Sequence, residues 1–138
     1  MINEIIKKLD LRKIKFNNLS FLAGDASDRR YFLIKQENIT NVLMFDNDRK
    51  NLEKFIKISN LLKELVSVPK IIVDIKEYGI LIIENFDQNK FSETLKKSNK
   101  RTLYKVALDA LIHIHKIKID NELAYYSKKT FFDESNLF

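Results

Sequence analysis

The chain has 138 residues, carries a formal net charge of +6 and is 45% hydrophobic. This length suits one domain with a buried core and is too short for two ordinary domains. With two glycines, one proline and no cysteine, the composition excludes a low-complexity chain, a disulfide framework and a thiolate metal site.

The positive charge permits contact with nucleic acid, nucleotide phosphates or acidic surfaces. The lysines are spread along the chain, as at Lys7, Lys54 and Lys116, so a solvated basic surface is the simpler explanation. No RNA-recognition or helix-turn-helix signature is present, and we do not expect nucleic acid as a partner. The start lacks a signal-peptide pattern and no apolar run approaches a membrane span, so we expect a cytoplasmic protein without a membrane partner.

Hydrophobic periodicity predicts one helix and then three short strands, at residues 2–14, 19–23, 30–36 and 41–45. Three consecutive short strands suggest an antiparallel meander. Asn47 or Asp48 can cap a second helix, whose apolar stripe runs to about Val66 before Pro69 ends it.

Two further strands are expected at residues 70–76 and 79–84, with a turn in which Gly79 takes a positive φ. Beyond them the pattern is helical, with helices predicted at 91–97 and 101–119. A loop is expected at 120–129, and residues 130–138 begin another element.

A loop of small residues joins the first two predicted strands, in the segment Leu22-Ala23-Gly24-Asp25-Ala26-Ser27-Asp28-Arg29-Arg30-Tyr31-Phe32. Gly24 can take a positive φ, Ala26 and Ser27 leave room, and the Ser27 hydroxyl can donate, so phosphate oxygens can approach the backbone. Because strand side chains alternate, either Arg29 or Arg30 should face the cavity of the loop. By itself, such a loop is more commonly a plain hairpin connection.

The order of elements and five segments resemble the aminoglycoside phosphotransferase family, and within it the bacterial cytoplasmic kinases of N-acetylmuramate and N-acetylglucosamine. These segments are Leu22–Phe32, Val42–Met44, Val68–Ile71, Gly79–Phe86 and Leu111–His115. The resemblance spans most of the chain and about the first half of a family member. It implies an α+β fold, with a kinase-like small lobe at 1–86 (a five-stranded antiparallel sheet plus a helix) and the hinge and first helices of a truncated large lobe at 87–138.

The resemblance implies that ATP is bound. The loop containing Gly24, Asp25, Ala26 and Ser27 would cover the phosphates. The segment Glu84-Asn85-Phe86 would hold adenine, because an extended hinge offers a carbonyl and an amide that match the exocyclic amine and a ring nitrogen. Without the resemblance, Glu84 would be interpreted as a strand-end carboxylate in water.

The sequence departs from the kinase pattern in its third strand. Many kinases place a lysine there, which pairs with the phosphates and with a glutamate on the next helix. Here Met44 or a neighbour occupies that place, and Glu53 lacks its usual partner. Our hypothesis is that Arg30 substitutes for the lysine from the adjacent strand.

The catalytic motif is a second departure. Phosphoryl transfer needs a base-like aspartate, a nearby asparagine and an aspartate for Mg²⁺, and this sequence reaches Phe138 before such a motif. We therefore expect no catalytic residue and no metal ligand in it, and Mg²⁺ only together with the missing half. His113 and His115 lie in a helical stripe and are interpreted as ordinary helix histidines.

The resulting hypothesis is the nucleotide-binding half of an ATP-dependent phosphotransferase acting on a hydroxyl of a sugar or aminoglycoside-like molecule. The alternative is a non-catalytic remnant of the kinase fold that serves as a binding or interaction module. The apolar helix face from Leu103 to Ile114 would then meet a complementary large-lobe chain or a second copy.

Overall fold

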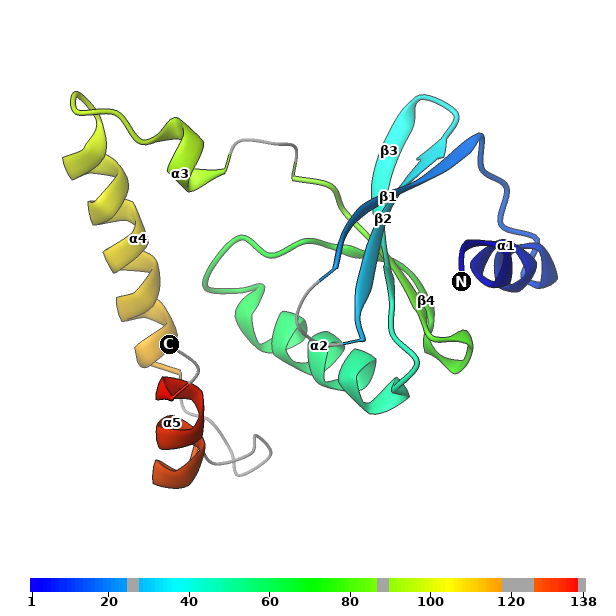
Figure 1. Ribbon diagram of the computed structural model, residues 1–138. Coiled ribbons are helices and arrows are strands. Elements are labelled where there is room, and N and C mark those ends of the chain that lie inside the picture. Colours follow the sequence, from blue (N-terminus) through cyan, green and yellow to red (C-terminus); the bar gives the residue numbers. More distant parts are fainter. Residues whose placement is uncertain (25–27, 87–89, 118–125, 137–138) are drawn as a thin grey trace.

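The computed structural model describes residues 1–24, 28–86, 90–117 and 126–136. It confirms a mixed α+β fold with one five-stranded antiparallel sheet. The elements are α1 (Ile2–Leu11), β1 (Asn18–Gly24), β2 (Arg30–Gln36), β3 (Ile39–Phe45), α2 (Arg49–Leu62), β4 (Ile71–Ile75), the 3₁₀ turn η1 (Lys76–Tyr78), β5 (Ile80–Ile83), α3 (Phe91–Thr94), α4 (Lys100–His115) and α5 (Lys128–Ser135) (Figure 1).

The strand order in the sheet is β1-β2-β3-β5-β4. The first three strands form the expected meander, and α2 then carries the chain to the far edge, where β4 begins. Strand β5 returns between β3 and β4. All four residues of β5 are buried, which explains why Ile80–Ile83 is a continuous apolar run.

Alternating side chains give the sheet two different faces. On the first, which we call the α1 face, Ile5 and Leu9 of α1 pack on Phe32, Ile34, Leu43, Phe45, Ile80 and Ile82. On the second, the α2 face, Leu52 of α2 packs on Met44, Leu81 and Ile83, with Tyr31 and Val42 beside them. Figure 1 shows α1 beyond one side of the sheet and α2 below it, with α4 set apart from both.

Several element boundaries differ from the predictions. Strand β3 begins at Ile39 and not at Asn41, because a tight turn in which Glu37 has a φ of 54° suffices to reverse the chain. Helix α2 ends at Leu62 and not at Val66, since the amides of Leu65 and Val66 both donate to the Leu62 carbonyl in irregular turns before Pro69.

The C-terminal helices also differ in length from the predictions. Helix α3 has four residues and stops at Thr94. Helix α4 begins at Lys100 and ends at His115. The predicted loop at 120–129 lies mostly outside the described residues, and the last predicted element is α5.

Gly79 connects η1 to β5 and has the predicted positive φ, at 76°. Its carbonyl accepts a hydrogen bond of 3.0 Å from the amide of Asp46. A Cβ atom at this position would lie 2.6 Å from the Asp46 carbonyl oxygen. The absence of a side chain therefore serves both the left-handed backbone and the contact with the end of β3.

We expect Gly79→Ala to lower the free energy of unfolding by about 2 kcal/mol or more, since it combines a left-handed non-glycine residue with a backbone clash. Urea unfolding followed by circular dichroism measures the change. Gly24→Ala is the control, because its Cβ would meet the flexible Arg30 side chain at 3.0 Å. Equal effects of the two substitutions would contradict the argument.

Candidate nucleotide-binding site

The connection between β1 and β2 is described at its two ends. Asp25, Ala26 and Ser27 lie outside the described residues. Gly24 pairs with Arg30 across the two strands and, among the described glycines, Gly79 is the one with a positive φ. Gly24 therefore does not use its capacity for a left-handed backbone in this structure. Its lack of a side chain has another use, because a Cβ there would lie 3.0 Å from the Arg30 Cδ.

The two arginines that follow this connection point to different sides of the sheet. Arg30 lies two residues before Phe32 and four before Ile34, so it is on the same face of the strand as these two residues, the α1 face. The Arg29 side chain lies on the α2 face, where its Nε is 3.5 Å from Oδ2 of Asp46. Arg30 Nη1 donates a hydrogen bond of 2.8 Å to the Arg29 carbonyl.

Asp46, directly after β3, is 1% exposed and holds three segments together. Its Oδ1 accepts from the amide of Asp48 at 2.8 Å, and its Oδ2 accepts from Nδ2 of Asn51 at 3.1 Å. The same Oδ2 faces Arg29. The sequence analysis did not identify this residue, although an acidic residue between a buried apolar run and a helix cap was the available signal.

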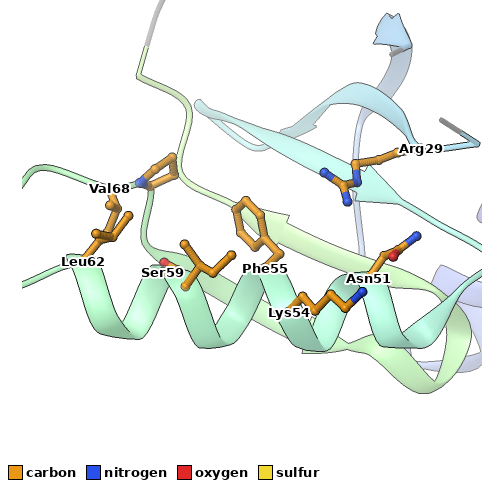
Figure 2. Close-up of a pocket in the computed structure, with 9 residues that line it drawn as sticks. Arg29, Asn51, Lys54, Phe55, Ser59, Leu62 and Val68 are labelled. Atoms are coloured by element: carbon orange, nitrogen blue, oxygen red, sulfur yellow. The ribbon is translucent and has the colours of Figure 1, made fainter. Parts of the chain in front are cut away.

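A cleft of about 340 Å³ opens between α2 and the start of β2 (Figure 2). Its walls are mainly apolar, with polar and cationic side chains at one end. The lining residues are Arg29, Asn51, Lys54, Phe55, Ile58, Ser59, Leu62, Val68 and Pro69. An apolar cleft with a few converging polar groups is the usual form of a small-molecule site.

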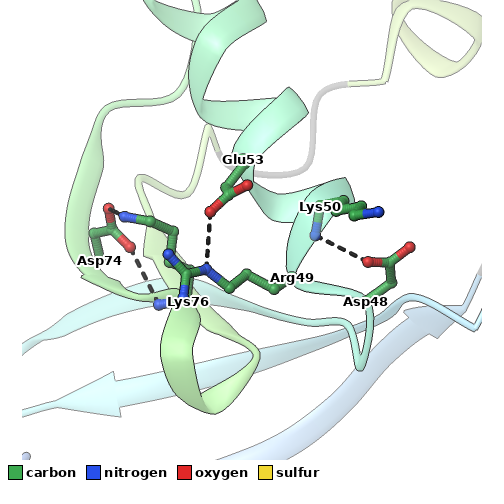
Figure 3. Close-up of polar contacts among 6 residues, drawn as sticks. All are labelled: Asp48, Arg49, Lys50, Glu53, Asp74 and Lys76. Atoms are coloured by element: carbon green, nitrogen blue, oxygen red, sulfur yellow. Dashed lines mark hydrogen bonds and ion pairs between the residues drawn. The ribbon is translucent and has the colours of Figure 1, made fainter.

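The third strand and α2 lack the pair that kinases usually place there. Met44 is fully buried in the apolar cluster of the α2 face. Figure 3 shows Glu53 on the helix surface, where its Oε1 lies 2.8 Å from the Nε of Arg49. Asp48 caps the helix by accepting from the amide of Lys50. Glu53 therefore pairs along its own helix, at an exposed position.

The segment after β5 departs from the regular ladder at Glu84. The Glu84 amide donates to the Lys70 carbonyl at 2.8 Å, but the Lys70 amide donates to the side-chain Oε2 of Glu84 at 3.1 Å. Antiparallel partners normally exchange two backbone bonds, so here the carboxylate takes the place of the Glu84 carbonyl. Within the described part of the chain, no hydrogen bond engages that carbonyl. The carboxylate is thus bonded to the backbone of the neighbouring strand.

Phe86 and Asn85 complete this segment. The Phe86 side chain is 54% exposed, and Asn85 is half-buried. Glu84 and Phe86 both border a second cleft of about 660 Å³, which the C-terminal end of α2 and the start of β4 also line.

The sheet register sets the distance between the start of β2 and the end of β5. Arg30 is paired with Phe45, whereas Ile83 is paired with Val42, three residues along the same strand. Three residues along a strand span about 10 Å, and two strand spacings across the sheet together span about 10 Å. Arg30 and Ile83 are therefore separated by roughly 14 Å. This separation suits an extended nucleoside triphosphate.

Other candidate chemistry is limited within the described residues. They contain no group of three or more metal-binding side chains. His113 donates from Nδ1 to the Asp109 carbonyl of its own helix at 2.7 Å, as an ordinary helix histidine does. None of the helices described is long and apolar enough to cross a membrane.

Comparison with known proteins gives two relatives with one name. The chain is 30% identical, over 118 residues, to the N-acetylmuramate/N-acetylglucosamine kinase of Pseudomonas aeruginosa; the match covers 84% of this chain and 35% of the relative. It is 25% identical, over 139 residues, to the N-acetylmuramate/N-acetylglucosamine kinase of Pseudomonas putida, covering 99% of this chain and 41% of the relative.

No family model matches the chain, and no solved structure matches it. The two similarities support a relation to sugar kinases, as the motifs suggested. The chain spans between about a third and two fifths of the length of these curated relatives. Membership of the aminoglycoside phosphotransferase family and the division at residue 86 stay predictions.

We expect Asp46→Ala to lower the free energy of unfolding by about 3 kcal/mol, because it leaves the buried partners of the carboxylate unsatisfied. Thermal or urea unfolding measures the loss. Asp74→Ala is a matched control, since Asp74 forms a surface ion pair of 2.8 Å with Lys76 (Figure 3). We expect its loss to cost less than about 1 kcal/mol, and a similar cost at both positions would contradict the central role of Asp46.

Proposed function

We propose that this chain is the ATP-binding part of a phosphotransferase that acts on a hydroxyl group of an amino sugar or a similar small molecule. The observation that carries the proposal is the register of the sheet, in which the start of β2 and the end of β5 are separated by roughly the span of a nucleotide. The relation to sugar kinases supports the reaction class. The sheet and α2 are compatible with a kinase-like small lobe.

In this proposal the segment Glu84-Asn85-Phe86 holds adenine. The Glu84 carbonyl accepts from the exocyclic amine, and the Phe86 amide donates to a ring nitrogen. The hydrogen bond from the Lys70 amide to the Glu84 carboxylate supports this role, because that amide then does not need the Glu84 carbonyl as its acceptor.

The phosphates would lie toward Gly24, Asp25, Ala26 and Ser27, at the other end of the separation. The base-like aspartate and the Mg²⁺ ligands that phosphoryl transfer requires would come from a further part of the polypeptide or from another chain.

A binding or interaction module is the second candidate, and the surface of α4 favours it. Val106, Leu108, Leu111 and Ile112 are each more than half exposed, at 61%, 58%, 54% and 51%. A helix that is apolar on several sides is normally buried. In the kinase proposal the rest of a large lobe covers this helix, and in the module proposal a partner or a second copy does so.

Titration of the chain with ATP, followed by NMR or calorimetry, tests the proposed function. We expect weak binding, because one wall of the site is missing, and a preference for ATP over inosine triphosphate of roughly tenfold, since inosine lacks the amine that the Glu84 carbonyl accepts from. Absence of binding at millimolar ATP would reject the proposal.

Two substitutions of Glu84 test the hinge itself. In Glu84→Ala the Lys70 amide loses its side-chain acceptor and draws the carbonyl back into the ladder, so we expect the preference for adenine to fall toward unity. In Glu84→Gln the side-chain oxygen still accepts, and the preference should persist. The ratio of the two dissociation constants is measured for each protein, and identical ratios in all three would argue against the hinge.

We also expect the isolated chain to self-associate through α4, because its exposed apolar side chains gain from burial. The double substitution Val106→Lys and Leu111→Lys should shift the sedimentation profile toward the monomer. Lys105→Gln, at an exposed position of the same helix, is the control and should leave the profile unchanged. A monomeric wild-type protein would contradict this expectation.

A further inference from the structure

A buried carboxylate and a neighbouring arginine stand at the cleft of the α2 face. We propose that Arg29 binds the β- and γ-phosphates of the nucleotide and that Asp46 positions it, so that this pair replaces the lysine–glutamate pair of other kinases. The inference rests on the proposed function and assigns the phosphate-binding cation, for which the sequence analysis favoured Arg30.

The packing of α1 and α2 indicates which face of the sheet is open to a nucleotide. Ile5 and Leu9 of α1 are fully buried against the α1 face. The α2 face instead carries the cleft that runs from Arg29 to Pro69, so we place a triphosphate that extends from the segment after β5 over that face. Arg30 has the parity of the α1 face, whereas Arg29 lines the cleft beside α2 (Figure 2).

The surroundings of Arg29 suit a phosphate. Its side chain is 25% exposed and lines a cleft with mainly apolar walls. Lys54 and Asn51 line the same cleft, and they add a second cation and an amide. Partial burial strengthens charge interactions relative to water, and a guanidinium matches phosphate oxygens in a two-pronged geometry.

Asp46 supplies the fixed anchor. Two donors, the Asp48 amide and the Asn51 side chain, hold its carboxylate, and Arg29 meets it through Nε at 3.5 Å. An arginine has five N–H donors, so a contact through Nε does not exhaust its capacity. The carboxylate can thus orient the guanidinium as a helix glutamate orients the lysine in other kinases.

The residues at the positions of the usual lysine–glutamate pair have other contacts in this chain. Met44 contributes an apolar side chain to the core, and Glu53 pairs with Arg49. Compared with the usual pair, the carboxylate lies directly after β3, two residues beyond Met44, and not on α2, and the cation lies directly before β2 and not in β3. The pairing of a cation with a carboxylate at the phosphate end of the site is kept.

Substitution of two adjacent arginines provides a matched test. Dissociation constants for ATP, ADP and adenosine are measured by NMR or calorimetry for the wild type, Arg29→Ala and Arg30→Ala. We expect Arg29→Ala to weaken ATP binding by about tenfold or more, with a smaller loss for ADP and none for adenosine. Arg30→Ala removes the same charge from the other face and should change ATP binding less than about twofold.

The outcomes separate the two proposals. A wild-type protein that fails to bind ATP rejects the proposed function. A wild-type protein that binds ATP, with Arg29→Ala binding it equally well, overturns the present inference alone. Selective loss of ATP binding in Arg30→Ala also overturns it and restores the hypothesis for Arg30.

Further variants exclude a purely structural role for Arg29. Arg29→Gln keeps a donor for Asp46 without the charge, and Arg29→Lys keeps the charge without the planar fork. We expect ATP affinity to fall in the order wild type, Lys, Gln, with adenosine affinity constant. If Arg29→Ala does not fold, these two decide the matter, and loss of adenosine binding in both overturns the inference.

Discussion

The buried carboxylate of Asp46 is the interaction on which the rest of the structure depends. The Asp46 side chain joins Arg29, the residue before β2, to Asn51 in the first turn of α2. The Asp46 backbone amide joins the end of β3 to Gly79 in the turn before β5. Three connections that are distant in sequence thus meet at one residue. Two of its side-chain partners, Arg29 and Asn51, line the cleft beside α2, so this residue lies at one end of the candidate site.

Much of the scaffold could be predicted from the residues. The meander, the amphipathic stripe of α2 and the left-handed turn at Gly79 are local signals, and the structure contains each of them. Helix ends were less predictable, since the residues after Leu62 keep the helical pattern while Pro69 and the packing end the helix early. The burial of Asp46 was not predictable, because an aspartate beside a helix cap resembles a surface residue and the segments that cover it are distant in sequence.

In the candidate site too, features that depend on contacts between distant segments could not be predicted from the sequence. Alternation predicted that one of the two arginines faces a cavity, but it could not decide which one, because the face that each helix covers is set by packing between segments distant in sequence. The segment after β5 was expected from the resemblance to kinases. The exchange of a backbone acceptor for the Glu84 carboxylate depends on the pairing of β4 with β5, whose own register shifts between Ile71 and Val73.

The position of β5 also governs the order in which the sheet can be completed. Among the five strands of the sheet, β5 is the last to be synthesised, yet it lies between β3 and β4. Until Ile80–Ile83 emerges, the nascent chain presents the outer edge of β3 with open backbone donors and acceptors, a form prone to intermolecular pairing. When these four consecutive apolar residues insert, they pair with β3 on one side and with β4 on the other. Assembly of the whole sheet therefore depends on this short segment.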